Sequence, residues 1–463
     1  MNIVHVSAEY YPFAKVGGLA DVVYGLSHQQ TKMRMRVSVF IPEYSLLDRE
    51  QLGEGERVYE GRLKNVSYSV VRYTHQKTAV YLFRFSDRLF DRDSIYGQKD
   101  DFTRFLQFSL ACSDFLLQKK VKADVVHLHD WQAAYASFLI KPLGCKIVLT
   151  LHNLEHQGRG PIGELLQLAP SVPWIGKDEV NLLEIGIDQA DVVVTVSPRY
   201  KEEILTWQGS WGLDAALGRN RHKLHGIING LGDAPFNPRD DRFLTEKLQG
   251  ESIQSILSFK KSAKKELQEL LGKRLITPLI VTVSRLAHQK GLDFMTHLCE
   301  MTETLGCSYL ILGIPATNEL GKHFAYLKEK YRDSPYVHIS LEFNLRLSHL
   351  AFAAADFTYI PSLFEPCGLT QMIGIRYKSI PIARATGGLI NTIHDYNDKN
   401  IPQQERNGYL FSGWGFDPSD SAIRRALQDY NNKKNFEDHL LNLSKFRFSW
   451  DEPERAYFAL YKS

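Results

Sequence analysis

The chain has 463 residues, 44% of them apolar and 24% charged, which is ordinary for a globular protein and long enough for roughly two to four domains. A net charge of +3 is too small to indicate a nucleic-acid or membrane-surface partner. The five cysteines form no C-x-x-C pair, which argues against a disulfide framework or a zinc site. Since there is no signal-peptide pattern and no apolar run of the roughly 18 residues that span a bilayer, we expect a cytoplasmic protein.

The first half of the chain alternates short apolar, β-branched runs with longer amphipathic stretches. Strands are expected at 3–6, 37–41, 79–83, 125–129, 146–151 and 191–197. Helices are expected at 101–116 and 131–140. Such alternation is typical of a parallel sheet covered by helices on both faces.

A second series of the same kind follows a segment rich in Gly, Pro, Asn and Asp. That segment, 229–238, is expected to be a linker. Strands are then expected at 280–284, 308–312, 337–340, 357–361 and 380–383, and helices at 262–271, 291–305 and 348–354. The pattern predicts an α/β protein with two doubly wound sheets, and ligands bind outside the carboxyl ends of such strands.

The first candidate site is Lys-Val-Gly-Gly-Leu-Ala-Asp at 15–21, after the first strand. Gly17 and Gly18 let the backbone approach a ligand, and the helix start together with Lys15 can hold a phosphate. The alternative is an ordinary tight turn in which Asp21 complements the helix dipole. The spacing is not G-x-G-x-x-G, so the dehydrogenase fingerprint is absent.

Two further strand ends carry polar residues. At the end of strand 125–129, Asp130 either caps a helix or faces a ligand, and Trp131 suits the apolar face of a sugar. The preceding His-x-His has no third ligand nearby in sequence, so no metal site is expected. After strand 146–151, His152 either donates a hydrogen bond into a cleft or is a structural histidine, and Asn153 follows it.

The second half offers a phosphate clamp. Arg285 and Lys290 follow the strand at 280–284 and can hold a departing diphosphate, although solvent-facing charge is the alternative. Residues 362–371, Ser-Leu-Phe-Glu-Pro-Cys-Gly-Leu-Thr-Gln, put Glu365 where a strand passes into a helix. The N–H groups of Gly368, Leu369 and Thr370 would open at that helix N-terminus, which attracts phosphates. Cys367 is expected to pack beside the loop.

Other common catalytic patterns are absent from the sequence. We find no Walker loop, no H-E-x-x-H and no recognisable Ser-His-Asp or Cys-His set. A carboxylate beside a phosphate cradle therefore favours chemistry on a phosphorylated donor.

Taken in order over nearly the whole chain, these motifs resemble bacterial glycogen synthase and plant starch synthase, glycosyltransferase family 5. Further matching segments are Ala-Asp-Val-Val-Val-Thr-Val-Ser-Pro at 190–198, Lys-Leu-His-Gly-Ile-Ile-Asn-Gly at 223–230 and Ala-Thr-Gly-Gly-Leu at 385–389. The sequence is most similar to the glycogen synthases of chlamydia-type bacteria.

The resemblance implies the GT-B architecture, two Rossmann-like domains facing across a deep cleft. Its domains would be 1–235, 236–445 and a C-terminal helix, 446–463, that crosses back to the first domain. The implied reaction moves glucose from ADP-glucose, with UDP-glucose as the alternative donor, to the 4-hydroxyl of an α-1,4-glucan with retention. No cofactor, metal, nucleic acid or membrane is expected to take part, and the oligomeric state is left open.

The resemblance also implies residue roles. Arg285 and Lys290 would hold the donor phosphates, and Glu365 would contact the transferred glucose. His152 would bind the side of the sugar that carries the 6-hydroxyl, and Asp130 would face the acceptor or donor sugar. Substrate-binding residues would be Lys15, Gly17, Gly18, Asp21, Asn153, Phe343, Cys367, Gly368, Leu369 and Thr370, with Phe343 stacking on the nucleotide base.

Several positions depart from the family pattern. They are Gly232 for a usual Asp, His156 for Tyr, Pro315 in a Gly-x-Gly turn, Phe343 for Tyr, Lys378 for Gly and Asn391 for Asp. None removes a residue with an implied catalytic role, so we expect an active enzyme. The alternatives are another GT-B transferase, a catalytically silent glucan-binding scaffold, and a phosphorylase that uses pyridoxal phosphate. The sequence has no recognisable Schiff-base lysine motif of the kind that such a phosphorylase needs.

Overall fold

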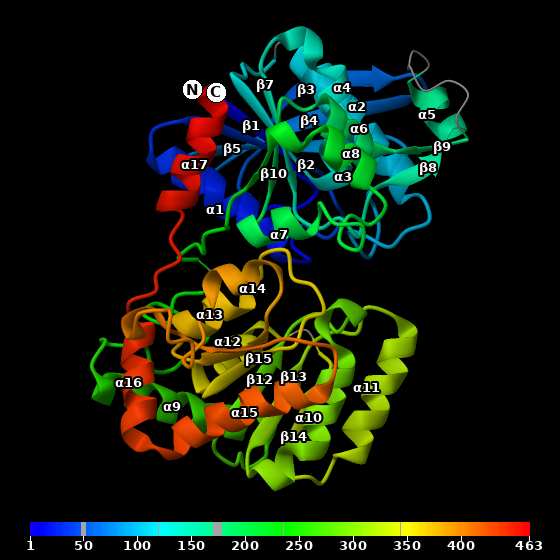
Figure 1. The fold of residues 1–463 in the computed structure, drawn as a ribbon. Coiled ribbons are helices and arrows are strands. Elements are labelled where there is room, and N and C mark those ends of the chain that lie inside the picture. The colour runs from blue at the N-terminus through cyan, green and yellow to red at the C-terminus, as the bar shows by residue number, and fades with distance from the viewer. Residues whose placement is uncertain (48–51, 119, 170–177, 235, 343) are drawn as a thin grey trace. The chain divides into compact units, whose positions relative to one another are not determined.

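The computed structural model describes residues 1–47, 52–118, 120–169, 178–234, 236–342 and 344–463. The chain divides into two compact units (Figure 1): unit 1 is Met1–Gly230 with Ser449–Ser463, and unit 2 is Leu231–Phe448. The boundaries between the units fall at 230/231 and 448/449, whereas the boundaries expected from the sequence were 235/236 and 445/446. The last helix, α17 (Asp451–Lys462), is therefore part of unit 1.

Unit 1 contains a nine-stranded sheet in the order β11-β10-β7-β6-β1-β2-β5-β4-β3. Its strands are β1 (Asn2–Val6), β2 (Arg36–Pro42), β3 (Glu56–Leu63), β4 (Val66–His75), β5 (Thr78–Phe85), β6 (Val125–His129), β7 (Lys146–Leu151), β10 (Val192–Thr195) and β11 (Leu224–Gly226). The strands from β11 to β5 are paired in parallel, whereas β3, β4 and β5 are paired antiparallel. A separate antiparallel pair joins β8 (Arg159–Pro161) to β9 (Glu179–Asn181).

Helices pack around the unit 1 sheet. They are α1 (Gly18–Lys32), α2 (Asp101–Leu117), α3 (Asp130–Ala134), α4 (Ala136–Leu139), α5 (Ile162–Leu168), α6 (Leu182–Gln189), α7 (Pro198–Glu203), α8 (Asp214–Arg219) and α17. β6 is buried along its whole length, as expected of a central parallel strand that is covered on both faces.

Unit 2 is a parallel six-stranded sheet in the order β14-β13-β12-β15-β16-β17. Its strands are β12 (Leu279–Val283), β13 (Ser308–Leu312), β14 (Val337–Ser340), β15 (Phe357–Ile360), β16 (Ile380–Arg384) and β17 (Tyr409–Phe411). Its helices are α9 (Ile253–Leu271), α10 (Leu292–Leu305), α11 (Asn318–Lys330), α12 (Leu345–Ala354), α13 (Thr370–Arg376), α14 (Gly387–Thr392), α15 (Phe416–Asn431) and α16 (Lys433–Leu443).

The predicted strands are all found, each within a few residues of its predicted ends. The hairpin β3–β4 was not predicted, because its alternating and largely exposed residues lack the apolar run that marks buried strands. The three-residue strands β8, β9, β11 and β17 were not predicted either. The helix expected at 131–140 is interrupted at Tyr135 and forms the short helices α3 and α4.

Each sheet has a point where the strand order reverses, and ligands of doubly wound folds bind there. In unit 1 this point lies between β1 and β6, and in unit 2 between β12 and β15. The four loops that follow these strands carry most of the predicted site residues. Among the residues that the structure describes, no helix is both long enough and apolar enough to cross a bilayer.

Candidate active site

The unit 2 switch point brings Glu365 and Lys290 together. The Lys290 ammonium lies 2.6 Å from Oε2 of Glu365, and the Ser362 hydroxyl donates to the same oxygen at 2.8 Å. Glu365 is nearly buried, with 9% of its side chain exposed, whereas Lys290 retains 20%. Two predicted residues that are 75 positions apart in sequence thus form one charged pair at the strand ends.

Backbone contacts hold this pair in place. The Gln289 amide donates to the Phe364 carbonyl at 3.1 Å, and the Leu363 N–H donates to the Gln289 carbonyl at 2.8 Å. Gly291 has φ +72°, and a Cβ there would lie 2.1 Å from the Pro361 carbonyl oxygen. A side chain at this position would push the lysine loop away from the glutamate loop, so glycine is required here.

Arg285 lies just beyond β12 and is exposed to solvent. Its guanidinium forms no hydrogen bond or ion pair with any residue that the structure describes. A cation at a strand end with its donors unused suits an anionic ligand. Of the two cations predicted to hold the phosphates, Lys290 is therefore paired with Glu365, whereas Arg285 is exposed.

The loop after Glu365 leads into α13 as the sequence analysis expected. Gly368 has φ +76°, and α13 starts at Thr370 without a side-chain cap on Leu369. The Gln371 amide donates to the carbonyls of Cys367 and Gly368, at 3.1 and 2.8 Å, which fixes the turn. Cys367 is buried, and its carbonyl oxygen would lie 2.3 Å from a Cβ on Gly388, so the turn packs closely on the start of α14.

In unit 1, the loop after β1 is organised by a residue that the sequence analysis missed. Oε2 of Glu9 accepts hydrogen bonds from the N–H groups of Val16 and Gly17, at 2.6 and 3.0 Å. Burial raises the pKa of Glu9, and these two hydrogen bonds oppose that rise. Since the Gly17 N–H is already used inside the protein, it is not available to a phosphate as predicted.

The remaining residues of this loop stay accessible. The backbone from Val16 to Gly18 is exposed, and a Cβ on Gly17 would meet no atom within 4 Å, so protein packing does not demand glycine there. Lys15 and Asp21 form an ion pair of 2.7 Å at the start of α1. Burial raises the pKa of Asp21 and Lys15 lowers it. The predicted lysine is thus anchored beside an open loop.

Asp130 fixes the backbone that follows β7. Its Oδ1 accepts from the N–H groups of His152 and Asn153, at 2.6 and 3.4 Å. Burial raises the pKa of Asp130 to about 7, although both hydrogen bonds lower it. The residue has φ +56°, a left-handed conformation that side chains rarely adopt and that is often found at functional sites. Asp130, His152 and Asn153 therefore form one local group.

Trp131 does not offer the sugar-binding face suggested by the sequence. It is buried, with 7% exposure, and stacks edge-on against Phe105 with 5.2 Å between ring centroids. Gly158, at φ +63°, makes room for it, since a Cβ there would lie 2.2 Å from the indole ring. Its role is to fill the core behind Asp130.

The histidines of β6 have a third neighbour that sequence proximity could not reveal. His5 of β1 pairs in register with His127, and ligand nitrogens of His5, His127 and His129 lie within 4.8 Å of one another. Every one of these ring nitrogens already has a hydrogen-bond partner in the protein, which accounts for the cluster without an ion.

Two of the family departures, Lys378 and Pro315, have visible local contacts. Lys378 has φ +63°, the conformation that glycine adopts freely, and its ammonium pairs with Glu251 at 2.8 Å. Gly313 packs against the Ser284 carbonyl oxygen, which would lie 1.9 Å from a Cβ at this position. Pro315 forms an isolated parallel β-bridge with Leu286. Phe343, the predicted base-stacking residue, lies outside the described residues.

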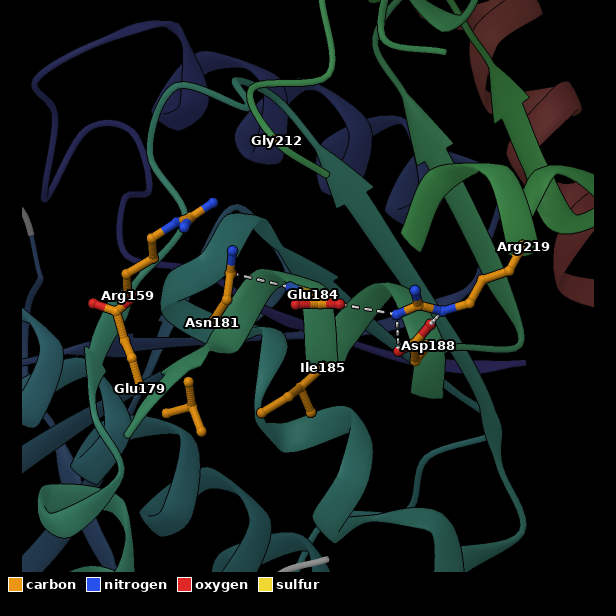
Figure 2. Close-up of a pocket in the computed structure, with 9 residues that line it drawn as sticks. Arg159, Glu179, Asn181, Glu184, Ile185, Asp188, Gly212 and Arg219 are labelled. Atoms are coloured by element: carbon orange, nitrogen blue, oxygen red, sulfur yellow. Dashed lines mark hydrogen bonds and ion pairs between the residues drawn. The ribbon is translucent and has the colours of Figure 1, made fainter. Parts of the chain in front are cut away.

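Unit 1 also has a polar pocket of about 260 Å³ away from the predicted residues (Figure 2). It is lined by Arg159, Glu179, Val180, Asn181, Glu184, Ile185, Asp188, Gly212 and Arg219. Arg219 spans the pocket to Glu184 and Asp188, at 3.0 and 2.6 Å. Because Arg219 is neutralised by these two carboxylates and none of the lining residues is a predicted site residue, we assign this pocket no part in the predicted chemistry.

Comparison with known proteins supports the resemblance seen in the sequence. Residues 2–219 match the starch synthase catalytic domain family. A glycogen synthase of Protochlamydia amoebophila is 34% identical over 512 aligned positions, covering 100% of this chain and 99% of that protein. A probable starch synthase 4 of Arabidopsis thaliana is 33% identical, with 100% of this chain covering 47% of that protein.

Solved structures agree. The catalytic domain of starch synthase IV from Arabidopsis thaliana, bound to ADP and acarbose, superposes with a TM-score of 0.93 at 32% identity, covering 99% of this chain and 98% of that one. A sucrose-phosphate synthase from Thermosynechococcus elongatus shares the fold at a TM-score of 0.61 and 15% identity, over 100% of this chain and 98% of that one. The predicted GT-B fold class and the predicted family are both confirmed.

Proposed function

Because this chain belongs to the glycosyltransferase family of bacterial glycogen synthases and plant starch synthases, we propose that it elongates an α-1,4-glucan with glucose from a sugar nucleotide. ADP-glucose is the proposed donor, and the 4-hydroxyl at the non-reducing end of the glucan is the acceptor. The ADP and acarbose bound to the Arabidopsis starch synthase support this pairing of ligands. A cytoplasmic location belongs to the same proposal.

The observation that carries the proposal is the set of charges at the unit 2 switch point. Lys290 and the exposed Arg285 supply positive charge where a diphosphate would leave, and Glu365 supplies negative charge within 2.6 Å of Lys290. The transition state of glucosyl transfer has a positively charged sugar and a departing diphosphate. Cations at the phosphates and a carboxylate at the sugar stabilise both charges as they develop.

Glu365 is proposed to anchor and stabilise the transferred glucose. Its Oε2 already accepts hydrogen bonds from Lys290 and Ser362. A sugar hydroxyl that binds to the same oxygen would therefore either add to these two donors or replace one of them. In this proposal retention arises on one face of the sugar, with the leaving phosphate assisting deprotonation of the acceptor hydroxyl. A double displacement through a carboxylate is the competing mechanism.

Several residues of unit 1 are proposed to bind sugar. Asp130 accepts a hydrogen bond of 2.6 Å from the backbone N–H of His152, and burial raises the pKa of Asp130 and lowers the pKa of the His152 ring. Asn153 completes the proposed sugar contacts, whereas Lys15 and Gly18 are proposed to lie at the donor phosphates, with Lys15 also near the acceptor. Gly17 would contribute space, since its N–H donates to Glu9.

A donor panel tests the proposal. Purified protein is given glycogen and ADP-, UDP- or GDP-glucose, and both nucleoside diphosphate release and lengthening of the glucan chains are measured. Fastest release with ADP-glucose together with chain growth supports the proposal. Preference for UDP-glucose would change the donor alone. Binding of glycogen without release from any donor would instead favour a glucan-binding scaffold.

A further inference from the structure

A line of buried hydrogen bonds runs from His152 into the core of unit 1. Nε2 of His152 lies 3.0 Å from Nδ1 of His129, and Nε2 of His129 lies 3.0 Å from Nδ1 of His5. Nε2 of His5 then lies 2.8 Å from Oε1 of Gln30, on α1. His5, His129 and Gln30 have no exposed surface, so water cannot substitute for a missing partner along this line.

The glutamine gives the line a direction. Its Oε1 can only accept, so Nε2 of His5 carries a hydrogen and Nδ1 of His5 is an acceptor. His129 must then donate from Nε2 to His5, which makes Nδ1 of His129 an acceptor for His152. The hydrogen of a neutral His152 is therefore on Nε2, pointing into the core, and its Nδ1 is left with a lone pair.

The C-terminal helix supplies a second partner for the glutamine amide. Nε2 of Gln30 donates to the Tyr461 hydroxyl of α17 at 3.1 Å. That hydroxyl lies 2.8 Å from Nδ1 of His127, whose Nε2 lies 2.6 Å from the Thr150 hydroxyl. With the amide in this orientation, Tyr461 donates to His127 and His127 donates to Thr150. Turning the amide of Gln30 would reverse the whole set.

We propose that Gln30, His5 and His129 are positioning residues that hold the His152 ring with Nε2 protonated and Nδ1 free to accept a hydrogen bond from a sugar hydroxyl. This rests on the proposed function for the identity of the ligand. It also reverses the role expected from the sequence, in which His152 donates into the site. Among the described residues nothing bonds to Nδ1 of His152, and the residue is partly exposed.

Burial keeps the whole line neutral, as this arrangement requires. It lowers the pKa of His152 to about 3 and that of His5 to about 4, and it holds the pKa of His129 well below its usual range. A protonated ring would have two donors and would break the alternation of donor and acceptor.

The tautomer of His152 in the wild-type protein is the direct test. Two-bond ¹H–¹⁵N correlation spectra of histidine-labelled protein at pH 7.5 distinguish protonated from unprotonated ring nitrogens, and a His152→Gln variant identifies the signals of His152. We expect a protonated Nε2 and an unprotonated Nδ1 in the free protein. A protonated Nδ1 would overturn the proposal.

Variants of His129 test whether the line matters to turnover. His129→Leu removes both hydrogen bonds and should lower kcat about 10- to 100-fold, the usual effect of losing an outer-shell orienting group, and a mixture of His152 tautomers should appear. Glutamine also offers one donor and one acceptor, so His129→Gln should restore most of kcat and the single tautomer. Equal losses in both variants would contradict the proposal.

Thr358→Val is the matched control. It removes a buried threonine hydrogen bond of similar length, 2.7 Å to Ser379, in unit 2 and outside the network that contains His152. It should lower the unfolding midpoint while leaving the His152 tautomer and kcat near those of the wild type. A protein that shows the expected tautomer but transfers no glucose would refute the proposed function and leave the hydrogen-bond assignment intact.

Discussion

The two units present opposite kinds of chemistry at their switch points. In unit 2 the groups are charged, with Lys290 paired to the nearly buried Glu365 and Arg285 exposed. In unit 1 the Lys15–Asp21 ion pair follows β1, but after β6 and β7 burial favours neutral side chains, raising the pKa of Asp130 to about 7 and lowering that of His152 to about 3. This difference matches a reaction in which one ligand is a diphosphate and the others are uncharged sugars.

The largest expected effect is the loss of Glu365. Glu365→Ala removes the carboxylate and leaves Lys290 unpaired, so turnover should fall by at least about 100-fold, since groups of this kind contribute roughly 3 kcal/mol. The measurement is kcat with ADP-glucose and glycogen. Lys264→Ala, which removes another ion pair of unit 2, at 2.7 Å to Asp356, controls for stability. Near-normal turnover without Glu365 would contradict the proposal that the charged groups of unit 2 stabilise the transition state.

Arg285→Ala should have the next largest effect. Loss of charge-assisted hydrogen bonds to the diphosphate should weaken ADP binding roughly 10- to 100-fold and lower turnover as well. Titration calorimetry with ADP measures the change. Arg346→Ala, an exposed arginine of unit 2 paired with Glu266, should leave ADP affinity unchanged. If the Arg285 variant bound ADP as tightly as the wild type, the phosphate site would have to lie elsewhere.

Asp130 tests the neutral character of unit 1 through pH. Its carboxyl holds a proton more tightly when folded, with a pKa of about 7, than when unfolded, at about 3.9. Stability should therefore fall as pH rises from about 4 to about 7 and level off above that, by an amount on the order of a few kcal/mol. Asp130→Asn keeps the size of the side chain and should flatten this part of the curve.

Urea unfolding at pH values from 4 to 8 measures the effect of Asp130. The aspartate and asparagine proteins should differ most above pH 7, with the asparagine protein the more stable of the two there. Parallel curves for the two proteins would show that Asp130 ionises normally, and the contrast between the units would weaken.

The smallest expected effect concerns Lys378. Lys378→Gly relieves a left-handed conformation that costs other residues roughly 1 kcal/mol, but it loses the ion pair with Glu251. These terms oppose each other, so unfolding stability should change by less than about 1 kcal/mol. Lys378→Ala loses the ion pair and keeps the strain, so it should be the less stable variant. Thermal unfolding of both variants and the wild type shows whether lysine in place of the usual glycine at position 378 changes stability.

The sequence predicted the parts of the fold that depend on local pattern. Apolar, β-branched runs marked the buried parallel strands, and the motifs after them marked Lys15, Asp130, His152, Arg285, Lys290 and Glu365. The hairpin β3–β4 was missed because its exposed strands resemble polar surface. The fate of Trp131 was also beyond the sequence, since burial behind Gly158 depends on packing between distant segments.

Only the tertiary structure decided which groups meet. Glu9 reaches the loop at Val16 and Gly17 through a turn that no periodicity encodes. His5 meets His129 because β1 pairs in parallel with β6, and parallel partners are separated by long crossovers in sequence. Local sequence determined that these residues are buried or lie at strand ends, whereas register and sheet order determined that a charged pair forms in unit 2 and a line of histidines in unit 1.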